Sequence, residues 1–173
     1  MIEASNYSVI ETLRDGHPME IRALKPEDGA SLALALERLS APSLYRRFFA
    51  VRRNFTEKEA DYFVNVDFVN HVALIAVIKV EGRPTIVGGG RYVLVQPGRA
   101  EVAFAVTDEY QGKGVGAALM RHLTAIAREA GIGELIADVL SENTPMLKLF
   151  EKCGCRMSTT RDAEVVHVTL GLI

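Results

Sequence analysis

The sequence lacks several features that would assign it to a particular class of protein. No apolar run in its 173 residues approaches the roughly 20 residues that a membrane helix needs. The first residues show no basic-then-apolar pattern of a secretory signal. The formal net charge of −2 gives no basic excess of the kind that indicates a nucleic-acid binder. We therefore expect a cytoplasmic protein that binds neither a membrane nor a nucleic acid.

Cysteine is also scarce, because the chain contains only Cys153 and Cys155. A structural zinc site takes about four ligands, and no second ligand pair follows this Cys-x-Cys. We expect two reduced, partly buried thiols and no bound metal.

The remaining composition is that of one ordinary globular domain. A chain of 173 residues and 19.0 kDa, 49% hydrophobic and 24% charged, can bury a proper core. We expect a single domain over residues 1–173, with residues 1–7 flexible. Apolar periodicity and turn signals predict a hairpin, helices, three strands, a helix, a strand, a helix and final strands. This order predicts an α+β domain with a mostly antiparallel central sheet.

The predicted strands cover 8–13, 19–24, 72–80, 85–95, 99–106, 135–140 and 164–172. Helices are predicted from Pro26, over 43–49, from Thr56, over 117–130 and over 145–152.

The most informative segment is the loop Gln111-Gly112-Lys113-Gly114-Val115-Gly116. It follows the predicted strand 99–106 and opens the predicted helix 117–130. Glycines let the backbone come close to a ligand, and the first N–H groups of a helix have no intrahelical partner. Together with the helix dipole, these features predict an anion site, most naturally for phosphate.

The spacing of the glycines indicates which kind of phosphate-containing ligand the loop would bind. Glycines at 112, 114 and 116 do not fit G-x-G-x-x-G, and no Gly-Lys-Ser/Thr follows as in a Walker A loop. On the spacing alone, a tight strand-to-helix turn that binds no ligand is an alternative interpretation. The pattern Gln-x-x-Gly-x-Gly between a strand and a helix resembles the acyl-CoA pyrophosphate loop of the GNAT superfamily of N-acyltransferases.

This resemblance implies a GNAT-like fold in which the strand before the loop splays from the next parallel strand, with helices flanking the sheet. The co-substrate is then acetyl-CoA, whose pantetheine arm pairs with the backbone of Phe104, Ala105 and Val106. An N–H near Ala105 would stabilise the oxyanion, and Asn143 would bond the pantetheine. No metal is implied. The pyrophosphate would be held by Gln111, Gly112, Lys113, Gly114, Val115, Gly116 and Ala117.

A candidate general base precedes the loop. Alternation puts Glu101 on the strand face that it shares with Ala103 and Ala105. A carboxylate near apolar neighbours is desolvated, which raises a carboxylate's pKa toward the range where a general base works best. The pattern Ala-Glu-Val-x-Phe resembles the protein-lysine branch of the superfamily, in which this glutamate is the base. We expect Glu101 to act directly or through a water, the alternative being an ordinary polar residue at a strand edge.

The chain departs from the superfamily at Phe150. Many members carry a tyrosine seven residues after the asparagine that matches Asn143, and this tyrosine protonates the leaving thiolate. Phenylalanine has no proton to give, so the thiolate would leave unassisted or take a proton from water or the product ammonium. The branch that depends on the tyrosine keeps its base at the position of Asp138, which is therefore the second candidate base.

The acceptor is indicated by the resemblance of the whole chain, including the hairpin at 13–16, to bacterial protein-lysine acetyltransferases that modify acyl-CoA synthetases. The basic, aromatic segment 45–49 with Arg52 and Arg53 would engage an acidic patch on such a protein, or it is simply a solvated helix face. We expect direct acetyl transfer in a ternary complex to a protein lysine. A small-molecule amine acceptor, or a non-catalytic acyl-CoA-binding module, are the alternatives, and the oligomeric state stays open.

Overall fold

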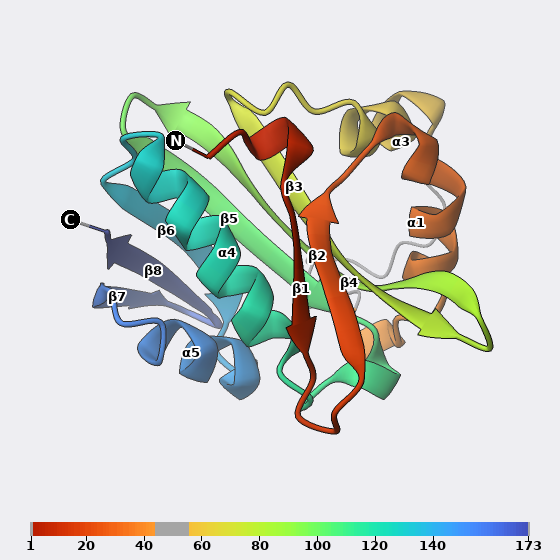
Figure 1. Cartoon of the computed structure of the whole chain (residues 1–173). Helices are drawn as coiled ribbons and strands as arrows, with labels where there is room; N and C mark the ends of the chain where they lie inside the picture. The colour runs from red at the N-terminus through yellow and green to blue at the C-terminus, as the bar shows by residue number, and fades with distance from the viewer. Residues whose placement is uncertain (1, 44–55, 173) are drawn as a thin grey trace.

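The computed structural model describes residues 2–43 and 56–172 (Figure 1). The predicted helix over 43–49 and the basic segment around Arg52 lie largely outside the described residues. Within the two described ranges, no helix is long and apolar enough to cross a membrane.

The described chain alternates between strands and helices in the predicted order, with one further strand. The strands are β1 (Ser8–Thr12), β2 (Pro18–Ala23), β3 (His71–Val80), β4 (Arg83–Gln96), β5 (Arg99–Val106), β6 (Glu134–Leu140), β7 (Arg156–Asp162) and β8 (Val165–Gly171). The α-helices are α1 (Gly29–Glu37), α3 (Glu57–Val64), α4 (Val115–Glu129) and α5 (Thr144–Glu151). Short 3₁₀ turns are η1 (Ala4–Asn6), η2 (Pro26–Asp28) and η3 (Asp108–Tyr110).

All eight strands form one sheet in the order β1-β2-β3-β4-β5-β6-β8-β7. Every neighbouring pair is antiparallel except β5 and β6. These two parallel strands pair only from Arg99–Glu134 to Glu101–Ile136. Beyond Glu101 the strands separate, so the predicted α+β fold with a splayed parallel pair is confirmed.

Helices cover both faces of the sheet. In Figure 1, α4 lies across β5 and β6 with α5 beside it, while α1 and α3 lie at the right of the view, away from α4. Alternate residues of β3 accordingly enter two separate cores, with Leu74 facing α4 and Ile75 facing α1. Leu119 and Leu123 of α4 are fully buried. Because both of its faces are covered, β3 reads as a continuous apolar run rather than an alternating one.

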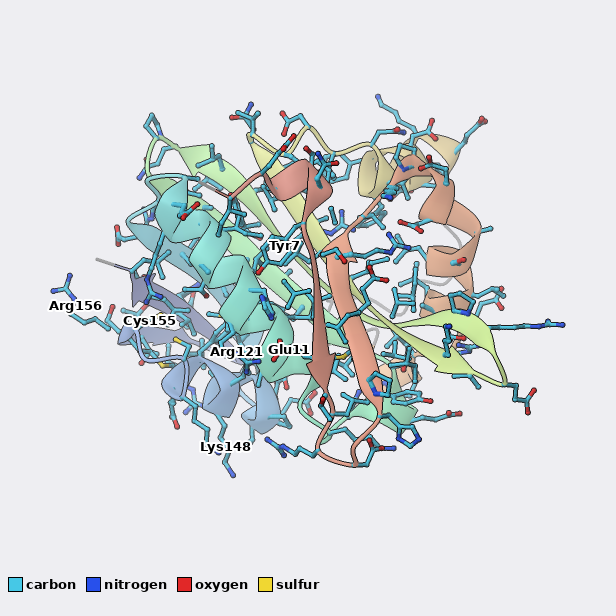
Figure 2. All side chains as sticks on the ribbon, in the orientation of Figure 1. Tyr7, Glu11, Arg121, Lys148, Cys155 and Arg156 are labelled. Carbon is cyan, nitrogen blue, oxygen red and sulfur yellow. The ribbon has the colours of Figure 1, made fainter. Side chains whose placement is uncertain are left out.

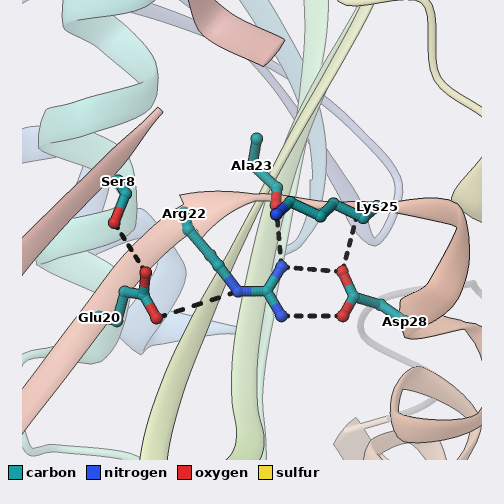
Figure 3. A network of polar contacts seen from close by, with 6 residues as sticks. All are labelled: Ser8, Glu20, Arg22, Ala23, Lys25 and Asp28. Atoms are coloured by element: carbon teal, nitrogen blue, oxygen red, sulfur yellow. Dashed lines mark hydrogen bonds and ion pairs between the residues drawn. The ribbon is translucent and has the colours of Figure 1, made fainter. Parts of the chain in front are cut away.

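An ion pair fixes the start of α1 against β2 (Figure 3). The guanidinium of Arg22 donates to both carboxylate oxygens of Asp28, at 2.8 and 2.9 Å, and to the carbonyl of Ala23 at 3.0 Å. The same carboxylate accepts from the N–H of Lys25 at 2.7 Å. Because Asp28 immediately precedes α1, these bonds hold the helix over the β3–β4 part of the sheet.

A second polar network joins β1 to α4. The hydroxyl of Tyr7 bonds Nδ1 of His122 at 2.5 Å, and the other ring nitrogen contacts Glu11. Glu11 also pairs with Arg121 (Figure 2). Tyr7, the last residue of the segment for which we predict flexibility, therefore has a partner on α4, and the flexibility of residues 1–7 stays a prediction.

Candidate active site

The glycine loop presents backbone N–H groups at the start of α4. Gly114 is the N-cap and has φ +98°, a left-handed conformation that residues with a side chain rarely adopt. The first intrahelical bond runs from the N–H of Ala118 to the carbonyl of Gly114, at 3.1 Å. The N–H groups of Val115, Gly116 and Ala117 therefore have no helical partner, and with the helix dipole they form a cradle for a phosphate.

The hairpin between β1 and β2 braces this loop from outside. The backbone N–H of Arg14 donates to the carbonyl of Lys113 at 3.3 Å, and its guanidinium donates to the carbonyl of Gly112 at 3.2 Å. The ammonium of Lys113 lies 3.8 Å from Asp15 and 5.0 Å from the ring centroid of Tyr110. The two loop carbonyls are thus turned toward the hairpin, which leaves the N–H side of the loop for an anion.

Gln111 connects the loop to the end of β5. Its side-chain amide donates to the carbonyl of Val106 at 3.0 Å and to the hydroxyl of Ser43 at 3.3 Å. In this arrangement the amide ties the loop to the end of β5, and the predicted role of Gln111 in phosphate binding stays a prediction.

A groove of about 640 Å³ begins at the loop and runs between the separated ends of β5 and β6 and along α4 and α5. Its floor includes Phe104 of β5 and Val139 of β6. Basic side chains line it from three directions, and Figure 2 shows two of them, Arg121 on α4 and Lys148 on α5. An apolar floor with a cationic rim suits a long ligand that carries several phosphates. The basic residues are Arg14, Arg121, Arg128, Lys148 and Lys152.

The pairing of β5 with β4 determines which peptide groups of the segment 104–106 face this gap. Thr107 donates its N–H to Val87 of β4 at 2.9 Å, so this pair is hydrogen-bonded across the ladder. Hydrogen-bonded pairs alternate in an antiparallel ladder, which directs the N–H of Ala105 to Gly89. The N–H groups of Phe104 and Val106 instead face the gap. An oxyanion donor near Ala105 would accordingly be the N–H of one of these two neighbours.

Asn143 lies at the wall of the groove and is 7% exposed. Its side-chain oxygen accepts from the N–H of Met146 at 3.3 Å, so Asn143 is the N-cap of α5. Thr144 is the first helical residue, so the helix begins one residue before the predicted start at 145. The Nδ2 group of Asn143 can still donate to a ligand, so capping and ligand binding are compatible.

Glu101 lies at the last paired position before β5 and β6 separate, on the face that it shares with Ala103 and Ala105, as predicted. Its side chain is exposed, which corrects the expectation that apolar neighbours desolvate it. Asp138 lies on the same face of β6 and lines the groove, unlike Glu101. Its carboxylate bonds Nδ1 of His167 at 2.5 Å. The structure therefore brings two carboxylates to the fork between the strands.

Phe150 fills the position where many superfamily members have the tyrosine acid. It is 1% exposed, and its ring packs edge-on against Phe104 with centroids 6.3 Å apart. This contact places an apolar ring directly behind the floor of the groove. Phe150 therefore has a packing role in the core between α5 and β5.

Arg91 of β4 and His71 of β3 lie on the face of the sheet that α1 and α3 cover. Arg91 donates to Nε2 of His71 at 3.2 Å and to the carbonyl of Phe63 at 3.1 Å. Burial, followed by the neighbouring guanidinium of Arg91, lowers the pKa of His71 to about 4. His71 is consequently neutral near pH 7 and serves as an acceptor for Arg91.

Both cysteines are free and half-buried. Burial, followed by a hydrogen bond with Cys153, raises the pKa of Cys155 to about 11, so its thiol is protonated near pH 7. In the ranges 2–43 and 56–172, no group of three or more His, Cys, Asp or Glu side chains gathers as a metal site would require.

The sequence indicated the loop but not the basic rim around it. Arg121 and Arg128 are seven residues apart on α4, and Lys148 of α5 is four residues before Lys152, the C-cap of that helix, so each pair lies on one helical face. This spacing was available as a signal. What it could not show is that the two faces meet across one groove, which depends on how α4 and α5 pack.

Comparisons with known proteins show the family to which the chain belongs. The model of the acetyltransferase (GNAT) family matches residues 36–155. An acetyltransferase of Pseudomonas aeruginosa is 30% identical over 163 residues, covering 91% of this chain and 87% of that protein.

Two further similarities are to Pat proteins. The acetyltransferase Pat of Mycolicibacterium smegmatis is 31% identical over 144 residues, which cover 82% of this chain but only 42% of that longer protein. The solved GNAT domain of PAT from S. lividans is 33% identical and superposes with a TM-score of 0.85, covering 95% of this chain and 96% of that one.

Proposed function

We propose that this chain, which belongs to the GNAT acetyltransferase family and is an acetyl-CoA-dependent acetyltransferase, modifies lysine side chains of proteins. The observation that carries this proposal is Glu101 at the fork of β5 and β6, within the Ala100-Glu101-Val102 pattern that resembles the protein-lysine branch. The similarity to the two Pat proteins supports the same acceptor class.

The donor is held by backbone and cations together. The free N–H groups at Val115–Ala117 bind the pyrophosphate, and the basic rim of the groove neutralises the phosphates. The pantetheine pairs with the gap-facing peptides of β5 and with Nδ2 of Asn143. The N–H of Phe104 or Val106 bonds the thioester carbonyl, where one such donor contributes roughly 3–4 kcal/mol to the transition state.

Transfer is direct, in a ternary complex. The amine attacks the thioester carbonyl, the C–N bond forms, the C–S bond breaks and CoA leaves as its thiolate. Holding both reactants in line supplies much of the rate. With Phe150 in the core, the thiolate takes its proton from water or from the product ammonium.

Glu101 receives the amine proton through water. Glu101 and Phe104 are three positions apart along the strand, so their Cα atoms lie about 10 Å apart, a spacing that suits a water between the carboxylate and the attacking nitrogen. Its exposure at the open fork leaves room for bridging waters. Asp138 lines the groove itself and is the second candidate base, in which case His167 positions it.

A protein acceptor of the acyl-CoA synthetase class is the partner that the resemblance suggests. A small-molecule amine is the alternative acceptor. It would need a pocket that selects a free cation, whereas Glu101 lies on an open face.

The test is acetyl transfer from labelled acetyl-CoA into a soluble bacterial lysate resolved by size, beside the Glu101→Gln variant. Discrete labelled proteins that lose their label with the variant would support a selective protein-lysine acetyltransferase. CoA release driven only by the low-molecular-weight fraction, with no labelled protein, would replace the proposal with a small-molecule acceptor.

A further inference from the structure

A second cavity adjoins the thioester end of the groove. It measures about 70 Å³ and lies below α1 and α3, on the face of the sheet opposite α4. Gly89, Ala103 and Ala105 form its floor, and Leu39 and Phe63 stand in its walls. Leu39, Ala103 and Ala105 line the large groove as well, so the two spaces meet at the position expected for the thioester.

The floor of this cavity is bare at Gly89, the middle of three consecutive glycines in β4, and packing requires glycine only at the outer two. A Cβ on Gly88 would come within 2.9 Å of Val115, and one on Gly90 within 2.6 Å of the Phe104 ring. Both point toward α4. A Cβ on Gly89 would have the carbonyl oxygen of Leu74, at 3.5 Å, as its nearest neighbour, which is ordinary contact. Packing of the sheet therefore does not demand glycine at position 89.

We propose that this cavity receives the tail of acyl groups longer than acetyl, so that propionyl-CoA and butyryl-CoA serve as donors in addition to acetyl-CoA. This rests on the acyl-CoA-dependent transfer proposed above and changes only the group transferred. A cavity needs about 10–15 Å³ to hold one water, so a cavity of 70 Å³ has room for one or two further methylenes.

The chemistry of the lining favours an acyl tail over the acceptor lysine. Among the described residues, the walls are mainly aliphatic and aromatic, and the charged group at the cavity is the guanidinium of Arg91. That cation is held in place by the carbonyl and the ring of Phe63, with the ring centroid 4.9 Å away. An incoming lysine ammonium would be repelled there, whereas an uncharged alkyl tail gains from burial.

The test is the dissociation constants of acetyl-, propionyl- and butyryl-CoA for the whole chain, measured by calorimetry without an acceptor. In the wild type, each added methylene should tighten binding about fourfold, which corresponds to the roughly 0.8 kcal/mol gained per buried CH₂. In Gly89→Val the side chain fills the cavity from its floor. The butyryl-to-acetyl affinity ratio should then fall by tenfold or more.

Ala127→Val is the matched control, because it adds bulk at a fully buried position of α4 that lines neither space. It should lower the thermal midpoint while leaving the butyryl-to-acetyl ratio unchanged. Ala103→Val fills the same cavity from β5 and replaces Gly89→Val if that variant does not fold. Longer acyl-CoAs that bind no tighter than acetyl-CoA in the wild type would overturn the proposal, as would a ratio that the filling variants leave unchanged. Because binding needs no acceptor, these outcomes are independent of whether lysine is the substrate.

Discussion

The phosphate end and the acyl end of the groove are built in different ways. At the phosphate end, the loop is one continuous segment whose residues Val115, Gly116 and Ala117 supply the free backbone N–H groups. At the acyl end, the walls come from α1, α3, β4, β5 and β6, and the two candidate carboxylates stand on different strands. Binding of the nucleotide thus depends on local backbone conformation, while choice of acyl group and acceptor depends on side chains that tertiary structure brings together.

The largest effect on acetyl-CoA affinity should come from Gly116→Leu. A Cβ at Gly116 already lies 3.6 Å from Leu149 and 3.9 Å from Val106, so a longer side chain occupies the groove. We expect the dissociation constant of acetyl-CoA to rise by about 100-fold or more, since both close backbone approach and space are lost. Ala130→Leu, which adds bulk at the exposed far end of α4, should leave affinity unchanged. Unaltered binding by Gly116→Leu would show that the ligand does not pass this position.

Arg14→Ala should have a smaller effect on the same measurement. It removes a cation of the rim and the guanidinium bond to the carbonyl of Gly112, but it leaves the N–H cradle in place. We expect a threefold to tenfold loss of acetyl-CoA affinity, the range for an exposed charge-assisted contact. The loss should shrink as salt is added. Arg161→Ala on the edge strand β7 is the charge-matched control. An equal loss of acetyl-CoA affinity in Arg161→Ala would mean that the effect of Arg14→Ala comes from net charge alone.

The smallest effect on affinity should come from Arg22→Ala, which is remote from the groove. Burial acts to raise the pKa of Asp28, but the bonds from Arg22 and from the N–H of Lys25 prevail and hold it below its usual range. A carboxyl group with a depressed pKa stabilises the fold above its unfolded value, about 3.9, and this stabilisation is lost as the pH falls through the folded value.

At pH 7, Arg22→Ala should therefore lower the thermal midpoint by a few degrees, and the difference from the wild type should narrow toward pH 3. Glu20→Gln, whose carboxylate lies 4.0 Å from Arg22, should change the midpoint less. A difference that stays constant with pH would contradict the assigned role of the Asp28 carboxylate.

Much of the fold follows from local patterns in the sequence. The Asp15-Gly16 turn, the Thr56–Glu59 capping box and the apolar run of β3 each specify their own element, and all three are present. The loop after β5 could be recognised because its function resides in a continuous backbone segment. The predicted roles of its individual residues stay predictions.

The positions that sequence could not settle depend on pairing between distant segments. Whether the N–H of Ala105 or that of Phe104 faces the gap depends on the pairing of β5 with β4, in which Ala105 lies opposite Gly89. The exposure of Glu101 depends on how far β6 pairs with β5. The cavity above Gly89 exists because α1 spans the sheet there, which no local spacing reveals.

The central claim is that donor binding and proton removal reside in separate parts of the site. It is tested most directly by measuring turnover and the acetyl-CoA dissociation constant of Glu101→Gln at neutral pH, with Asp138→Asn beside it. We predict that Glu101→Gln lowers turnover by about 10²-fold or more, the usual contribution of a general base, while the dissociation constant stays within about twofold. If Glu101→Gln leaves turnover unchanged and Asp138→Asn lowers turnover by about 10²-fold, the account is contradicted and the general base is Asp138 on β6.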